Sequence, residues 1–385
     1  MDNYPIRILR IVAVMNRGGI ETQIMNMYRK LDRNKFQFDF LVTRDENGVF
    51  DEEIEKLGGR IYRVPSVKKV GLIKFTKNID NFFKKHQEYK IVHCHMNTWS
   101  GLFLNIAKKH NIPVRIAQSH SAQQGVKNIT LERYVENTFK KIMKTFIKKG
   151  ANHFWAVGKE AGEWLYGERI AQGVMKIFPN AKDLEMYKYN LVYREKLRKE
   201  LGIPKETLLI GHVGSFSPVK NHEFLLQVFG NLRKKEIDCK LCLVGDGPLR
   251  NNMERKVSEM QMGDDILFLG LRNDVNKLMS AFDVLILPSK FEGMPNVVIE
   301  AQAASLPCVI SDSVTKEVDM GMGIVEFVSL SKTLDCWGNT IKNSRKDNRN
   351  LEIDNLKQKG YDLDSLINWL QDFYRREIKE ENMQH

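Results

Sequence analysis

The sequence predicts an α/β protein with two doubly wound domains, each built on a parallel sheet. The chain has 385 residues, of which 42% are hydrophobic, and this is enough material for two packed cores. Short apolar runs alternate with amphipathic segments of helical length, a pattern typical of β-α-β units. The runs form two series separated by a charged segment, so we expect one domain for each series.

The first series lies in residues 1–182 and contains six expected strands. They are Ile6–Val14, Phe36–Val42, Ile61–Val64, Ile91–Cys94, Val114–Gln118 and His153–Val157. The first run is interrupted by Arg7 and Arg10, so we interpret it as a buried strand rather than as the apolar core of a signal peptide.

The second series lies in residues 205–360 and contains five expected strands. They are Leu208–Val213, Lys240–Val244, Ile266–Leu269, Val284–Leu287 and Cys308–Ser311. We expect residues 183–204 to be a linker with a helix near Val192–Leu201. Residues 361–385 have apolar side chains at helical spacing and predict a terminal helix that crosses back to the first domain.

Positive charge is concentrated in the first half of the chain. The protein has 60 Lys and Arg against 48 Asp and Glu, and residues 1–182 hold 32 of the former and 17 of the latter. This half should therefore favour an anionic neighbour. Its segment 139–149 predicts a helix with lysines on one face and apolar residues on the other (Lys140, Lys141, Lys144 and Lys148 against Phe139, Ile142, Met143, Phe146 and Ile147).

This basic helix has two possible interpretations. It could lie on an anionic membrane, or it could be an ordinary surface helix whose apolar face packs on the core. We find no nucleic-acid motif, so we expect an anionic membrane surface rather than nucleic acid. No run approaches the 18 apolar residues of a spanning helix. We expect a cytoplasmic protein that can associate with the inner face of the cell membrane.

The five cysteines argue against a disulfide framework, because their number is odd and the chain is long. Cys239 and Cys242 form a C-x-x-C, but they lie in an apolar run and no second such pair exists, so we expect core packing rather than zinc.

Several loops that follow expected strands could hold a phosphate. Gly18-Gly19 lies between the first strand and a helix, where glycines allow close approach of a ligand and a helix N-terminus attracts anions. Lys220 lies at the mouth of another helix, where it could bind a phosphate or be a solvated surface lysine. In Gly245-Asp246-Gly247, Asp246 could equally cap a helix, as could Asp274 after Arg272.

Two glutamates are the most informative residues. Glu292 lies in the loop after Val284–Leu287, and Glu300 lies eight positions later in a helix with Pro295 in its first turn. Carboxylates bind sugar and ribose hydroxyls well, because each accepts more than one hydrogen bond. A chance pair on a solvated helix is the alternative, but Gly293 and Pro295 at the mouth of a strand-loop-helix unit favour a site.

The segment Phe291–Ala301 resembles the signature of retaining glycosyltransferases with the GT-B fold, which has two Rossmann-like domains and a cleft between them. The resemblance is to the family 4 type, the glycosyl transferases group 1, and in particular to bacterial capsular and exopolysaccharide glycosyltransferases. It also covers Pro179–Ala181, Gly211–His222, Leu243–Arg250 and Phe268–Val275, and more loosely Gly18-Gly19, His93–His95 and Ser119–Ser121.

The resemblance implies a role for each matching residue. Glu292, Lys220 and His120 would be catalytic: Glu292 beside the transferred sugar, Lys220 at the diphosphate, and His120 lining the sugar site. Without the resemblance, His120 would be read as a buried, satisfied histidine. The remaining residues would bind the donor, with Glu300 on the ribose and the backbone around Arg272 on the base (Gly18, Gly19, Ser215, Gly245, Asp246, Arg272, Gly293, Met294, Pro295, Asn296 and Glu300).

The resemblance further implies a metal-independent reaction, because protein cations and helix termini would stabilise the leaving group. No cofactor is expected besides the nucleotide sugar, expected to be a UDP-sugar, which is a co-substrate. The acceptor would be a glycan or a lipid-linked sugar used for surface polysaccharide. Ser215 stands where the family commonly has an arginine, and Ser305 where a glycine is usual. A nucleotide-sugar epimerase, a glycosidase and a non-catalytic nucleotide-sugar binder are the alternatives.

Overall fold

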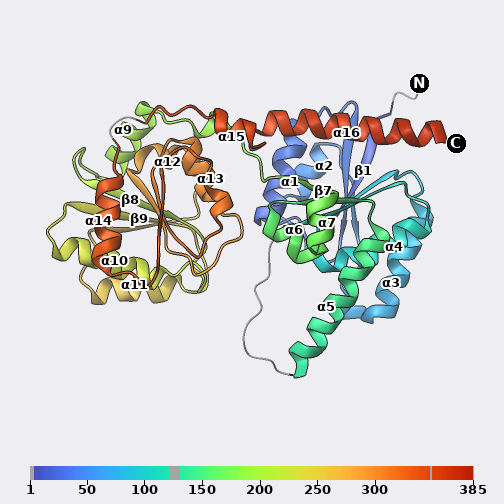
Figure 1. The fold of residues 1–385 in the computed structure, drawn as a ribbon, viewed down its shortest axis with the longest axis horizontal. Coiled ribbons are helices and arrows are strands. Elements are labelled where there is room, and N and C mark those ends of the chain that lie inside the picture. The colour runs from blue at the N-terminus through green and yellow to red at the C-terminus, as the bar shows by residue number, and fades with distance from the viewer. Residues whose placement is uncertain (1–3, 121–130, 347–348, 385) are drawn as a thin grey trace. The chain divides into compact units, whose positions relative to one another are not determined.

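The structure is a computed structural model, and it describes residues 4–120, 131–346 and 349–384. The chain divides into two compact units (Figure 1). The first unit comprises residues 1–181 and 363–385, and the second comprises residues 182–362. The chain therefore leaves the first unit once and returns to it at Leu363.

The sheet of the first unit has seven parallel strands in the order β3-β2-β1-β4-β5-β6-β7. Every pair of neighbouring strands is parallel, as expected for strands joined by helical crossovers. The strands are β1 (Ile6–Val12), β2 (Phe36–Val42), β3 (Ile61–Arg63), β4 (Ile91–Cys94), β5 (Val114–Ser119), β6 (His153–Ala156) and β7 (Met175–Ile177).

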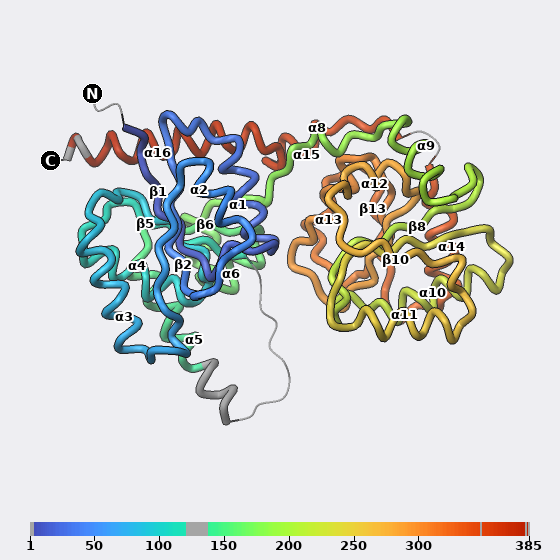
Figure 2. The backbone as a smooth tube through the Cα atoms, turned by 180° about the vertical axis from the view of Figure 1, so that it is seen from behind, coloured from blue at the N-terminus to red at the C-terminus, as the bar shows by residue number. Residues whose placement is uncertain are grey.

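Helices cover both faces of this sheet because its strands are apolar on both sides. Along β1, Ile8 and Val12 pack in a core with α1 and α16, whereas Leu9 and Ile11 pack in a core with α3, α4 and α6. Figure 2 shows α16 lying along this unit beside β1. The helices are α1 (Gly19–Lys30), α2 (Asp51–Lys56), α3 (Val67–Lys85), α4 (Ser100–Lys109), α5 (Leu131–Gly150), α6 (Lys159–Tyr166), α7 (Glu168–Gly173) and α16 (Leu363–Gln384), with a 3-10 turn at Asn97–Trp99.

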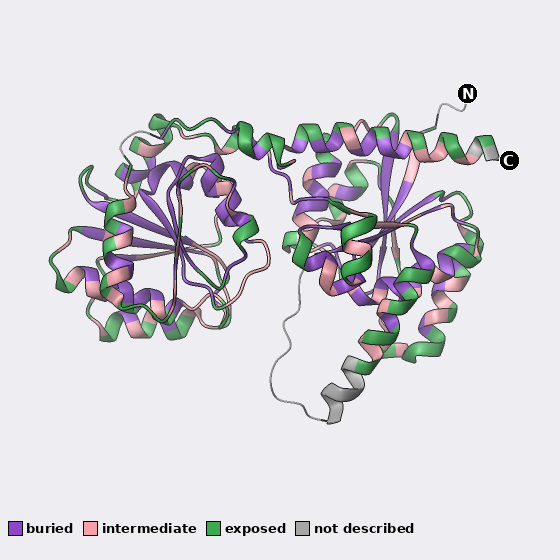
Figure 3. Ribbon diagram, in the orientation of Figure 1, coloured by how far each residue is buried: buried purple, intermediate pink, exposed green. Residues whose placement is uncertain are grey.

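The second unit has a six-stranded parallel sheet in the order β10-β9-β8-β11-β12-β13. Its central strands are buried, its edge strands are partly exposed, and its helices are exposed on their outer sides (Figure 3). The strands are β8 (Leu208–Val213), β9 (Cys239–Val244), β10 (Ile266–Gly270), β11 (Val284–Leu287), β12 (Cys308–Ser311) and β13 (Val325–Val328).

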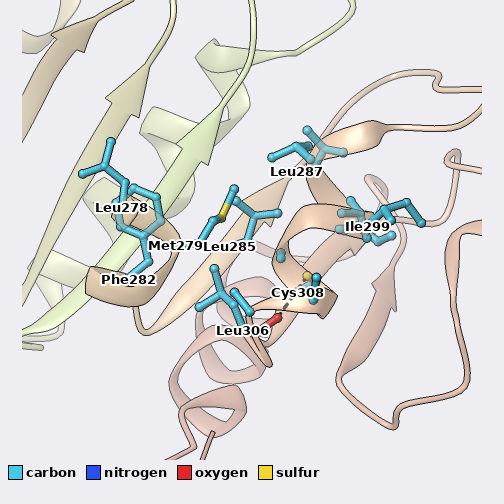
Figure 4. Close-up of a cluster of buried hydrophobic side chains, with 14 of the residues drawn as sticks. Leu278, Met279, Phe282, Leu285, Leu287, Ile299, Leu306 and Cys308 are labelled. Carbon is cyan, nitrogen blue, oxygen red and sulfur yellow. Dashed lines mark hydrogen bonds between the residues drawn. The ribbon is translucent and has the colours of Figure 1, made fainter. Parts of the chain in front are cut away.

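Two cores also enclose this second sheet. One contains α12 and α13 and includes the side chains of Phe282, Leu285 and Cys308 (Figure 4). The other contains α10, α11 and α14. The helices are α8 (Leu184–Tyr187), α9 (Leu191–Glu200), α10 (His222–Lys234), α11 (Arg250–Glu259), α12 (Val275–Ala281), α13 (Asn296–Ala303), α14 (Leu334–Ser344) and α15 (Asp354–Gln358), with a 3-10 turn at Lys316–Val318.

The expected fold of two Rossmann-like α/β domains is confirmed, but two strands were missed. β7 and β13 lie at sheet edges, and they are short and partly exposed, so neither forms an apolar run. Ile177 in β7 is 43% exposed. A hydrophobic pattern detects buried strands better than it detects edges.

The expected linker at residues 183–204 is corrected by the structure, because these residues belong to the second unit. They form α8 and α9, and Arg194 and Arg198 of α9 both pair with Asp283, at 2.6 and 3.1 Å. Leu184, Leu197 and Ile203 of the same segment also pack in the core of this unit. The terminal helix begins at Leu363, two residues later than expected.

The two cysteines of the C-x-x-C motif lie on opposite faces of the second sheet. Cys242 belongs to the core with α12 and α13, and Cys239 to the core with α10 and α11. Positions three apart on a strand point in opposite directions, so these two thiols cannot share one metal ion.

The basic helix α5 is less cleanly divided than its sequence predicts. Met143 and Ile147 are buried, but Ile142 and Phe146 are 51% and 43% exposed. Lys144 lies over the Trp164 ring, with its Nζ 4.1 Å from the ring centroid. Within the described part of the chain, no helix is both long enough and apolar enough to cross a membrane.

Candidate functional site

The expected donor-site residues of the second unit lie in loops at the carboxyl ends of its central strands. The loops after β8, β9 and β11 supply most of them, whereas Arg272 follows the edge strand β10 and Glu300 lies within α13; the order of the strands reverses between β8 and β11. Ligands of doubly wound sheets bind at such a reversal.

Glycines bring the first two of these loops into contact. Gly214 N–H donates to the Val244 carbonyl, and Phe216 N–H donates to the Asp246 carbonyl, at 2.9 and 3.0 Å. Gly245 has φ +135°, and a Cβ there would lie 2.1 Å from the Gly214 carbonyl oxygen. The position therefore requires glycine, because only glycine avoids both the strain and the clash.

Lys220 and Glu292 form an ion pair. Lys220 Nζ lies 2.6 Å from Glu292 Oε1, which also accepts a hydrogen bond from Ser289 Oγ at 3.1 Å. Each of the two charged side chains is 17% exposed. The two residues come from different loops, so the fold brings together a cation and a carboxylate that are 72 positions apart in the sequence.

Glu300 lies on α13 and has different partners. Its Oε1 is 2.8 Å from the Nζ of Lys182, and the two side chains are 13% and 9% exposed. Tyr187 donates a hydrogen bond to Glu300, and burial together with the Glu300 charge raises the pKa of Tyr187. Glu292 and Glu300 therefore belong to two separate ion pairs.

The residues between the two glutamates form the start of α13. Pro295 is the N-cap, one residue before the helix, rather than in its first turn as expected. Asn296 begins the helix, and its buried Oδ1 has no hydrogen-bond partner among the described residues. Met294 Sδ accepts a hydrogen bond from Tyr361 at 3.5 Å, and Gly293 is half-buried beside it.

Neither aspartate suggested as a helix cap caps a helix through its side chain. Asp246 Oδ1 accepts from the Gly247 N–H at 2.7 Å, and α11 begins later with Leu249 as its N-cap. Asp274 does occupy the N-cap position of α12, but its two carboxylate oxygens accept from Nε and Nη2 of Arg272, at 2.8 and 2.7 Å, rather than from the helix backbone. The pKa of Asp274 is lowered, chiefly by this hydrogen bond.

Ser215, the residue found where the family commonly has arginine, is exposed. Its hydroxyl donates only to Ser217 Oγ, at 3.2 Å, among the described residues. Within the second unit, Lys220 is thus the cation that the structure brings to Glu292.

The expected residues of the first unit lie at the carboxyl ends of β1 and β5. Gly18 is the N-cap of α1 and Gly19 is its first residue. Gly18 has ordinary extended backbone angles, but a Cβ there would lie 2.1 Å from the Glu21 carboxylate. A carboxylate therefore occupies the space beside this helix N-terminus.

His120 directly follows β5 and belongs to a buried polar network. Its Nε2 is 2.9 Å from Nδ1 of His95, and its backbone N–H donates to Asn97 Oδ1 at 3.1 Å. The rings of His93 and His95 stack with centroids 4.3 Å apart, and both contact the guanidinium of Arg10. The guanidinium is therefore the partner of one ring nitrogen of each of these two histidines. Burial, followed by the Arg10 charge, lowers the pKa of His120 to about 3.

Two partners of site residues were missed by sequence reasoning. Lys182 directly follows Pro179–Ala181, which the resemblance included, but nothing local points to Glu300. Arg10 had a visible signal, because it shares the inward face of its strand with Ile8 and Val12.

Comparison with known proteins gives the class of this chain. Residues 193–319 match the family described as "Glycosyl transferases group 1", and residues 18–175 match the "Glycosyl transferase 4-like domain". The chain is 36% identical to EpsF of Bacillus subtilis, a protein named as a glycosyltransferase, over 97% of both chains. The protein therefore belongs to the group 1 glycosyltransferases and is a glycosyltransferase enzyme of the GT-B type.

Two further similarities are more distant. The chain is 26% identical to UDP-Gal:alpha-D-GlcNAc-diphosphoundecaprenol alpha-1,3-galactosyltransferase of Escherichia coli, over 80% of this chain and 79% of that protein. HepE of Anabaena, solved in complex with UDP, has a TM-score of 0.70 at 16% identity and covers 98% of this chain and 100% of its own. This structural similarity establishes the shared fold.

Proposed function

We propose that this enzyme transfers a sugar, with retention of configuration, from a UDP-sugar to a glycan or lipid-linked acceptor in the synthesis of a surface polysaccharide. The observation that carries the proposal is the Lys220–Glu292 pair, half-buried at the carboxyl edge of the second sheet. UDP is suggested by the ligand of HepE and by the donor in the name of the Escherichia coli relative. The acceptor class follows the same relative's name and the similarity to EpsF.

The pair suits a diphosphate leaving group. Lys220 lies two residues before the first residue of α10, and Glu292 lies in the loop four residues before that of α13, so both side chains come from segments that lead into helix N-termini. A diphosphate would accept hydrogen bonds from Lys220 in place of Glu292. Glu292 would then be free to contact the transferred sugar, and the positive charge would stabilise the departing phosphate.

Glu300 is proposed to hold the ribose and the backbone around Arg272 to meet the base. Gly245 and its neighbours would let the chain approach the phosphates closely. In the first unit, Gly18 and Gly19 would approach the phosphates and His120 the sugar. Protein cations and helix termini supply the charge stabilisation, so the proposed reaction requires no metal.

Substitution of the pair tests the proposal. Lys220→Ala and Glu292→Gln should each lower kcat/KM for transfer from a UDP-sugar by at least about 100-fold, equivalent to ~2.7 kcal/mol. Lys290→Ala is the matched control, since this neighbouring lysine is exposed and its backbone N–H, rather than its side chain, contacts Val219. Turnover that is unchanged in both variants would refute the site assignment.

Product analysis of the same reactions is a second test of the proposed transfer. A new glycosidic bond to the acceptor supports it, whereas isomerised donor alone would contradict it.

We further propose that the first unit docks on an anionic membrane through α3 and α5. Gly71 has φ +76° and interrupts α3, and the next two residues, Leu72 and Ile73, are 47% and 88% exposed. Exposed Lys68 and Lys69 precede them in the sequence, and exposed Lys74 and Lys77 follow them. Exposed apolar side chains flanked by lysines suit the boundary between acyl chains and anionic headgroups.

The exposed apolar residues of α5 extend this surface. Trp99 connects the two helices, with its ring 6.4 Å from that of Phe75 in α3 and 5.1 Å from that of Phe139 in α5. Vesicle sedimentation tests the proposal. Binding should require anionic lipid and weaken with salt, and Leu72→Glu with Ile73→Glu should weaken it by at least about tenfold.

Val174→Glu is the control for this experiment, because Val174 is 70% exposed elsewhere in the first unit. Equal binding to neutral vesicles, or no binding at low salt, would overturn the membrane proposal.

A further inference from the structure

A chain of buried polar side chains connects the C-terminal helix to His120. Arg10 is fully buried on β1, and its Nη2 donates to the Tyr374 hydroxyl of α16 at 3.0 Å. Its Nη1 lies 2.6 Å from His93 Nδ1 and 3.2 Å from His95 Nε2. Among the described residues, Arg10 forms no ion pair with a carboxylate. The histidine rings and the Phe38 face, 4.0 Å away, are therefore its principal electrostatic partners.

The chemistry of arginine determines which ring nitrogens carry protons. A guanidinium only donates hydrogen bonds, so the nitrogens that face Arg10 must accept. His93 then carries its proton on Nε2, from which it donates to Gln118 Oε1 at 2.7 Å. His95 likewise carries its proton on Nδ1, which is the atom that faces His120.

The proton on His95 determines the state of His120 in turn. Since His95 Nδ1–H donates, His120 Nε2 must accept, and neutral His120 must carry its proton on Nδ1. An imidazolium at His120 would place two N–H donors 2.9 Å apart. In the reverse arrangement, with His120 donating, His95 Nδ1 would accept, and the single N–H of neutral His95 would then be on Nε2, against the Arg10 guanidinium. Both alternatives are electrostatically unfavourable in a buried network.

We propose that Arg10 and His95 are positioning residues that hold His120 as the neutral Nδ1–H tautomer. His120 would then act as a fixed hydrogen-bond donor toward an oxygen of the sugar or phosphate, and neither as a general base nor as a cation. This assignment to a ligand rests on the proposed function, whereas the tautomer itself does not. Tyr374 of α16 would support the same network, because its hydroxyl accepts a hydrogen bond from the Arg10 guanidinium.

Nitrogen NMR of the histidine rings tests the tautomer without substrate. In protein labelled with 15N-histidine, protonated and unprotonated ring nitrogens have distinct shifts, and loss of one spin system in His120→Gln assigns His120. We expect a protonated Nδ1 and an unprotonated Nε2 at pH 7. A protonated Nε2 on His120, in either a neutral or a charged ring, would overturn the proposal.

Arg10→Met tests whether Arg10 sets this state. Without the guanidinium, His95 can accept at Nδ1, so His120 should shift toward the Nε2–H tautomer and kcat/KM should fall on the order of tenfold. Arg10→Lys keeps a donor and should retain the wild-type tautomer. Arg33→Met is the control, because the Arg33 side chain donates to the Arg29 carbonyl at the surface of the first unit, outside the network. An unchanged tautomer in Arg10→Met would contradict the role of Arg10.

His95→Leu provides a second variant if Arg10→Met does not fold. It removes the donor to His120 Nε2 and should shift the His120 tautomer in the same direction. An unchanged His120 spectrum in this variant would overturn the proposal. Failure of the proposed function would appear differently, as absent sugar transfer with the Nδ1–H tautomer intact.

Discussion

The two units carry the same kind of parallel sheet but differ in net charge. The first unit holds 34 Lys and Arg against 22 Asp and Glu, which is the whole net charge of +12, and the second unit holds 26 of each. The candidate sites repeat this contrast. In the second unit, Lys220, Lys182 and Arg272 each pair with a carboxylate, whereas Arg10 in the first unit contacts neutral rings and a hydroxyl.

The candidate sites of the two units therefore differ in the contacts that their polar side chains make before a ligand binds. In the second unit, a charged ligand must exchange partners with ion pairs that already exist, so its binding is a competition between carboxylates and phosphates. In the first unit, hydrogen bonds determine proton positions before any ligand arrives. The units should therefore respond differently to mutation, pH and ionic ligands.

The largest expected effect on stability concerns one buried aspartate in each unit. Asp39 accepts from Arg7, Tyr89 and the Arg60 N–H, and Asp283 accepts from Arg194, Arg198 and the Leu209 N–H. Removing either carboxylate leaves buried donors without a partner, so Asp39→Ala and Asp283→Ala should each destabilise their own unit by about 3 kcal/mol.

Hydrogen exchange followed separately in β1 and β8 measures this effect. The exposed Asp372→Ala serves as the control, because its ion pair with Arg375 lies on the surface of α16. Equal loss of protection in both units from either single substitution would show that the units do not unfold independently.

Acid should destabilise the first unit more than the second. Burial is the main cause of a lowered histidine pKa in both units. It acts on four histidines of the first unit (His93, His95, His120 and His153) and on two of the second (His212 and His222). The pKa is lowered to about 3 for His120 and to about 4 for His153 and His222. Such histidines stay neutral when folded but take up protons when unfolded, below about pH 6.5. Stability is therefore present above pH 6.5 and is lost as pH falls toward 4, by at most ~1.4 kcal/mol per pH unit for a fully buried histidine.

Unfolding midpoints between pH 7 and pH 4.5, resolved by unit through hydrogen exchange, check this order. His93→Asn should make the first unit less sensitive to acid. A second unit that loses protection first would contradict the expectation.

The smallest expected effect concerns Glu300. Glu300→Gln removes the partner of Lys182 and one charged acceptor, so affinity for UDP should fall on the order of tenfold, or ~1.4 kcal/mol. Titration calorimetry with UDP measures the change. Glu185→Gln is the control, since Glu185 pairs with Lys188 at the surface, and unchanged affinity in Glu300→Gln would remove Glu300 from the proposed ribose site.

The sequence by itself determined the fold class and eleven of the thirteen strands found in the described residues, because buried strands are continuous apolar runs. It also determined the loops that carry Lys220, Glu292 and His120, since those loops follow such runs directly. The edge strands β7 and β13 and the attachment of residues 183–204 were missed, because their side chains are polar or partly exposed.

Only the tertiary structure decided the partners of these residues. Lys220 and Glu292 are joined because β8 and β11 are neighbours in the sheet, and Glu300 meets Lys182 because residues 182–204 pack on the second unit. His120 acquires its proton position from Arg10, which is 110 positions earlier in the sequence. Periodicity and local motifs report how a segment is buried, whereas ion pairs and proton positions depend on contacts between segments that only the fold brings together.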